Sequence, residues 1–149
     1  MKTIFIAVLC FCSISFCQAQ STGKDKALEV IGSFGGTTLY NVYVVIGMLA
    51  DSYVAEVYEA DYSKEILGEQ IGILTAFKQS TNELLSSGFL TDSEDQQFCR
   101  EIIACTDLLT SEANTLNTYL SYSTDENASA FQTARTNAWN NVAELLGLD

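Results

Sequence analysis

The feature that most constrains the fold is a regular stripe of mostly apolar residues between Thr91 and Ser123. Its members follow one another at alternating spacings of four and three: Phe98, Ile102, Cys105, Leu109, Glu112, Leu116 and Tyr119. Residues three and four apart share one face of a helix, so this spacing predicts a long helix that packs along other helices. Thr91 and Glu94 precede the stripe as Thr-x-x-Glu, which is typical of a helix start. The sequence therefore predicts one helix from this box to Ser123.

A second stripe lies between residues 37 and 62. Its members are Leu39, Val42, Ile46, Leu49, Tyr53, Glu56 and Ala60. We expect this helix to begin at Thr37 or Thr38, because threonine hydroxyls accept hydrogen bonds from free backbone N–H groups at helix starts. The mostly β-branched run 42–46 favours a strand by local propensity, but the periodic spacing extends much further and favours a helix.

Two more helices complete the set. One is predicted to run from Asp61 or Ser63 to the turn at Gly88, where glycine can adopt a left-handed conformation. The other follows a Ser-x-x-Glu box at 123–126 and is predicted to stop at Gly147. Its stripe consists of Ala128, Phe131, Arg135, Ala138, Val142 and Leu145.

These patterns predict an all-α fold, an up-down-up-down four-helix bundle over residues 37–149. The predicted helices are separated by only a few residues, and short connections require consecutive helices to run antiparallel. No segment alternates with a period of two for long enough to supply a sheet.

Residues 1–19 have the pattern of a secretory signal peptide. Lys2 supplies a positive charge, an apolar run extends from Ile4 to Phe16, and Ala19 suits cleavage before Gln20. The run is shorter than the roughly 20 apolar residues that span a bilayer. We therefore expect cleavage, no stable membrane anchor afterwards, and a secreted or periplasmic protein; an uncleaved anchor is the alternative.

Residues 20–36 are predicted to form a leading segment outside the bundle. The run 26–31 favours a short helix, but Gly32, Gly35 and Gly36 interrupt it. Each glycine lowers helix stability by about 1 kcal/mol relative to alanine. We therefore expect a hinge at Gly35 and Gly36, between the leading helical segment and the bundle.

The chain is strongly acidic. It has 19 acidic and 7 basic residues, which give a net charge of −12 at pH 7. Such a charge repels nucleic acid and anionic membrane surfaces, so we expect neither as a partner. Solubility accounts for this acidity, and recognition of a cationic partner is the alternative interpretation.

The chemistry of the chain does not favour catalysis or metal binding. There is no histidine, so the Glu-x-x-His pairs of carboxylate-bridged iron bundles and the axial ligand of haem are absent, and a nucleophile would lack its usual base. We expect no enzyme, no cofactor and no metal site. Cys99 and Cys105 lie six residues apart on one helix, about 9 Å along its axis, and cannot form a disulfide without breaking it.

Three charged residues fall on the apolar stripes and need partners. Glu112 and Arg135 lie at similar distances from the connection between their helices, so they are predicted to form a structural ion pair. Loss of one partner of such a buried pair costs roughly 3 to 5 kcal/mol. The same counting places Glu56 level with Gln70 and predicts a second, polar pair.

Two functional hypotheses follow, and the second of them involves tyrosines. Residues 40–62 contain five of them, which can form the edge of the core or a ligand platform: Tyr40, Tyr43, Tyr53, Tyr58 and Tyr62. The first hypothesis is an exported protein-interaction or structural module that acts through an exposed bundle face or through the leading helix, which predicts an uncovered apolar patch. The alternative is a carrier of a small apolar or amphipathic ligand, which predicts a cavity in the bundle core. The first hypothesis implies a protein partner, but the patterns specify neither that partner nor an oligomeric state.

Overall fold

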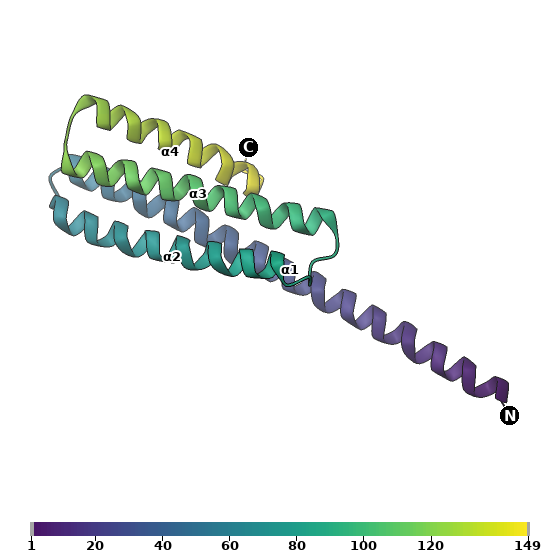
Figure 1. The fold of residues 1–149 in the computed structure, drawn as a ribbon. Helices are drawn as coiled ribbons and strands as arrows, with labels where there is room; N and C mark the ends of the chain where they lie inside the picture. Colours follow the sequence, from purple (N-terminus) through teal and green to yellow (C-terminus); the bar gives the residue numbers. More distant parts are fainter. Residues whose placement is uncertain (1, 149) are drawn as a thin grey trace. The chain divides into compact units, whose positions relative to one another are not determined.

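The computed structural model describes residues 2–148, with side chains described for residue 23 and residues 25–148. This range forms four helices and no strand: α1 (Lys2–Val54), α2 (Ala60–Ser86), α3 (Ser93–Ser121) and α4 (Asp125–Leu146). The chain divides into two compact units between Phe34 and Gly35. The second unit is an antiparallel four-helix bundle (Figure 1), which confirms the predicted fold class.

The long helix α1 has an apolar beginning that is compatible with a signal peptide. Its segment Asp25–Val54 is long and apolar enough to cross a membrane, judged by length and composition alone. Core helices of soluble proteins and signal sequences pass the same test of length and composition, and Leu39, Ile46 and Leu49 in this segment are almost completely buried within the bundle. The bundle core therefore accounts for part of this apolar character, since 33 % of the apolar window is buried.

The predicted stripes form the buried face of the bundle. Stripe residues on every helix are at most 4 % exposed: Leu39, Val42, Ile46 and Leu49 on α1, Leu67 and Leu74 on α2, Ile102, Cys105, Leu109 and Leu116 on α3, and Phe131, Ala138 and Val142 on α4. Burial of each large apolar side chain contributes about 1.5 to 3 kcal/mol relative to exposure. This shared core is therefore the main source of stability of the bundle.

Gly35 and Gly36 do not interrupt α1, so the predicted break in the helix at these residues is wrong. Both glycines are buried at close contacts between helices. A Cβ atom on Gly35 would lie 2.7 Å from Cζ of Phe77 on α2, and one on Gly36 would lie 2.5 Å from Cδ2 of Leu146 on α4. These glycines let α1 approach its two neighbours, and packing outweighs their low helix propensity.

The α1–α2 connection begins earlier than the stripe predicted, because α1 ends at Val54. The Val57 N–H donates to the Ser52 carbonyl (2.8 Å) and the Glu56 N–H to the Tyr53 carbonyl (3.0 Å), the pair of bonds of a Schellman motif. Glu56 occupies its left-handed position with φ of 57°. That conformation costs a residue with a Cβ roughly 1 to 2 kcal/mol, and the corresponding position at the end of α4 is filled by Gly147.

The helix starts differ from the predicted boxes by small shifts. The side chain of Asp92, not Thr91, caps α3 by accepting from the Glu94 N–H, and Thr124, not Ser123, caps α4 by accepting from the Asn127 N–H. α2 begins at Ala60 after an N-cap residue whose side chain makes no capping bond. The predicted stops at Gly88 and Gly147 are confirmed, since both have positive φ.

Candidate functional site

Glu112 is a fully buried carboxyl group on α3. Neither of its oxygens has a hydrogen-bond partner within the described part of the chain. Burial raises the pKa of Glu112 to about 8, although the positive charge of Arg135 acts in the opposite direction. At neutral pH the carboxyl group is therefore mostly protonated, which avoids burial of an unpaired negative charge.

Arg135 makes its close contacts with α1. Its Nη1 lies 3.6 Å from Oδ1 of Asp51, and its Cζ lies 5.9 Å from the ring centroid of Tyr43. A Cβ atom on Gly47 would lie 2.6 Å from Nη2, so this glycine leaves room for the guanidinium. Burial lowers the pKa of Arg135, but hydrogen bonding to Tyr43 and the charges of Asp51 and Glu112 outweigh it and raise the pKa. Arg135 therefore stays charged.

The structure brings Glu112 and Arg135 within electrostatic range, as counting along the helices predicted, but does not join them. Among the described ion pairs, Arg135 is paired with Asp51. The predicted ion pair is therefore corrected: Arg135 forms its ion pair with the exposed carboxylate of Asp51 on α1, and Gly47 leaves room for the guanidinium there.

Glu56 and Gln70 are not brought together. Glu56 lies in the α1–α2 connection and is exposed, whereas Gln70 is half-buried on α2. No hydrogen bond joins their side chains among those described for this part of the chain. The early end of α1 removes Glu56 from the buried stripe on which the prediction depended.

Cys99 and Cys105 are both buried, and they do not form a disulfide with each other, as their helical spacing predicted. Burial raises the pKa of both thiols, and that of Cys105 rises to about 11. Thiol reagents attack the thiolate, which is scarce at such a pKa.

We expect a chain beginning at Gln20 to react slowly with a thiol reagent at pH 8 and to show two fast thiols once urea unfolds it. A colorimetric thiol titration measures both. Fast labelling of the folded protein would place the cysteines at an accessible surface.

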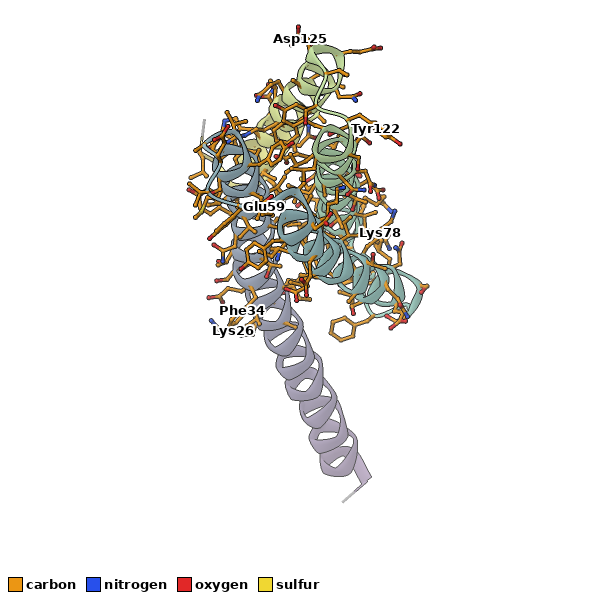
Figure 2. The ribbon with its side chains drawn as sticks, turned by 90° about the vertical axis from the view of Figure 1, so that its left-hand side faces the viewer. Lys26, Phe34, Glu59, Lys78, Tyr122 and Asp125 are labelled. Atoms are coloured by element: carbon orange, nitrogen blue, oxygen red, sulfur yellow. The ribbon has the colours of Figure 1, made fainter. Side chains whose placement is uncertain are left out.

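Three tyrosines and two valines gather at the end of the bundle where α1 joins α2 and α3 joins α4. Tyr53, in the last turn of α1, contacts the α3–α4 connection and α3. Its hydroxyl lies 2.8 Å from Oγ of Ser123, and its ring meets the Tyr119 ring edge-on at 5.9 Å between centroids. We call this end the turn-end surface, and its exposed apolar members are Val54, Val57, Tyr58, Tyr62 and Tyr122. Figure 2 views the bundle from this end, with Glu59, Tyr122 and Asp125 labelled.

The tyrosine stripe of the sequence is thus divided by the turn. Tyr40 and Tyr43 pack beside Trp139 of α4, as expected for the edge of a core. Tyr58 and Tyr62 instead pair edge-on with each other, 5.0 Å between centroids, at the turn-end surface. Sequence reasoning did not include Tyr122, which is 70 % exposed, because it lies outside every stripe.

Four of the pockets in the described part of the bundle each include exposed residues. One of about 230 Å³ lies between α3 and α4, one of about 400 Å³ between α2 and α3, and one of about 210 Å³ beside Val54 and Tyr119. The fourth, of about 350 Å³, lies at the α1–α2 connection and is lined by Tyr53, Glu56, Tyr58 and Glu59. These surface pockets give no support to a carrier site in the bundle core.

No family model, curated protein or solved structure matches this chain. The functional argument therefore rests on the surface and the core of the bundle itself.

Proposed function

We propose that this chain is an exported protein-interaction module that binds its partner through the turn-end surface. The supporting observation is the concentration there of exposed aromatic and aliphatic side chains, including Tyr122 at 70 %, Val54 and Val57 at 67 % each, and Tyr62 at 50 % exposure. Tyrosine is enriched at protein interfaces because it supplies a large contact area, loses little entropy and retains a polar group.

Rigid support also favours this surface as a binding site. Tyr53 and Tyr119 lie beneath it and connect α1, α3 and the α3–α4 connection through a hydrogen bond and a ring contact. A surface held in place before binding loses less conformational entropy when a partner docks. Export to a secreted or periplasmic location is part of the proposal and is supported by the apolar beginning of α1.

Affinity capture tests the interaction. We expect the chain beginning at Gln20 to retain a protein from the exported fraction of its own host. A Tyr58→Ser, Tyr62→Ser, Tyr122→Ser variant should no longer retain this protein, because the three substitutions remove the exposed rings of the turn-end surface. Quantitative mass spectrometry measures the difference.

The matched control is Phe89→Ser with Ile73→Ser, which removes two exposed apolar side chains away from the turn-end surface. Circular dichroism should show that both variants keep their helix content. Equal capture by the triple variant and the wild type, or the absence of any partner of the wild type, contradicts the proposal.

A further inference from the structure

We infer that the partner inserts a lysine or arginine side chain into the pocket lined by Tyr53, Glu56, Tyr58 and Glu59, an inference that rests on the proposed function. We call this pocket the turn-end recess. Its volume of about 350 Å³ is open to solvent at the α1–α2 connection. A side chain of another molecule can therefore enter it without any rearrangement of the bundle core.

The lining of the recess suits a positively charged group. Two exposed glutamates supply carboxylates, and two tyrosines supply aromatic rings. A cation gains charge-assisted hydrogen bonds from carboxylates and electrostatic attraction from the faces of aromatic rings. Arginine suits such a site better than lysine, because its planar guanidinium can stack on a ring and bond a carboxylate at the same time.

The charged residues around the recess are mostly acidic, which also favours binding of a cation. Residues 53–64 and 119–126 contain five acidic residues and one basic residue, Lys64. Lys64 lies 4.0 Å from Asp61, and none of the described ion pairs involves Glu56 or Glu59. The recess therefore keeps its negative charge available to a partner.

Glu56, which lines the recess, also has an uncommon backbone conformation. It is the one residue other than glycine with positive φ in the described part of the chain. Glycine fills the equivalent left-handed position after α4. Strained backbone conformations of this kind occur preferentially at functional sites.

Self-association through this surface is disfavoured by its charge. A symmetric contact between two copies brings the same patch face to face. Glu56, Glu59, Asp61, Asp125 and Glu126 of one copy would then oppose those of the other. Like charges across an interface are destabilising, so a basic segment of a different protein is the favoured occupant.

Fluorescence anisotropy with labelled hexaarginine, hexalysine and hexaglutamate peptides tests the inference on the chain beginning at Gln20. We expect hexaarginine to bind most tightly, hexalysine more weakly and hexaglutamate not at all. Glu56→Gln with Glu59→Gln should weaken hexaarginine binding about tenfold at about 0.15 M salt.

The matched control is Glu69→Gln with Glu83→Gln, which removes the same charge from two exposed positions on α2 that line none of the pockets described above. This control should change the affinity by less than about twofold. Tyr58→Phe should keep the affinity and Tyr58→Leu should lower it, because only the first retains an aromatic ring. Equal weakening by both glutamate pairs would mean that the peptide senses only the net charge, and would overturn the inference.

Failure of this inference is distinguishable from failure of the proposed function. If the host partner is lost by the triple tyrosine variant but kept by Glu56→Gln with Glu59→Gln, the turn-end surface binds a protein and the cationic contact is wrong. If both variants still capture the host partner, the proposed function is wrong as well.

Discussion

Replacement of Glu112 by leucine should stabilise the protein at pH 8 by several kcal/mol. The wild-type carboxyl is fully buried, has no hydrogen-bond partner in the described chain, and has a pKa raised to about 8 from 4.5. Each pKa unit corresponds to about 1.4 kcal/mol, so this rise amounts to roughly 4 to 5 kcal/mol at most. Leucine also removes an unsatisfied polar group, which itself costs about 1 to 3 kcal/mol.

The pH dependence has a definite sign. Because the folded pKa of Glu112 lies above the unfolded value, the folded protein holds a proton that the unfolded chain has already released between pH 4.5 and 8. The contribution of Glu112 to stability is therefore complete below pH 4.5 and is lost as the pH rises to 8. Glu112→Gln and Glu112→Leu should both remove this slope.

Urea unfolding followed by circular dichroism at pH 4, 6 and 8 measures these differences. Glu101→Gln, an exposed position on the same helix, is the control and should leave the slope unchanged. An ion pair with Arg135, as the sequence predicted, requires the opposite result, because Glu112→Gln would then cost roughly 3 to 5 kcal/mol. A large loss of stability in either Glu112 variant at pH 8 would thus show that the carboxylate is ionised and paired.

Gly35→Leu combined with Gly36→Leu should lower the free energy of unfolding by about 3 kcal/mol, because forced packing of extra carbons costs about 1 to 3 kcal/mol at each site. A Cβ atom at Gly35 meets the ring of Phe77, which is rigid. A Cβ atom at Gly36 meets the end of the Leu146 side chain, which can change rotamer. Most of the loss should therefore come from Gly35. Urea unfolding of the two single variants separates the contributions.

The control for this experiment is Gly68→Leu with Gly72→Leu on α2, where a new Cβ meets no atom within 4 Å. Leucine favours a helix over glycine by up to about 1 kcal/mol per site, so this variant should be more stable than the wild type. If the Gly35 and Gly36 substitutions also stabilise the protein, these two glycines do not act as close contact points between α1 and its neighbours.

The periodic spacing of apolar residues was sufficient to predict the four-helix fold and most of the core. Ile102, Leu109 and Leu116 are buried at the predicted positions because a helix repeats its face every three or four residues, whatever its neighbours are. Stops at Gly88 and Gly147 were predictable for an equally local reason, since glycine adopts positive φ without steric cost.

The tertiary structure decided those features for which the local sequence is compatible with two different structures. Low helix propensity at Gly35 and Gly36 is the same for a hinge and for a close contact, and only the positions of Phe77 and Leu146 distinguish them. The end of α1 could not be predicted from a glycine in the sequence, because Glu56 occupies the left-handed position there. That early turn removes Glu56 from the core and brings Tyr58 and Tyr62 to the turn-end surface.

The ion-pair partner of Arg135 also could not be predicted from the sequence. Rise per residue determines the level of a side chain along the bundle, so the proximity of Arg135 to Glu112 was predictable. Its direction depends on where another helix leaves space, and Gly47 leaves that space beside Asp51. The sequence by itself therefore determined the presence of the bundle helices, their order and most of their buried faces. The tertiary structure decided the course of α1 through Gly35 and Gly36, its end at Val54 and the side-chain contacts, because these depend on atoms distant in the chain.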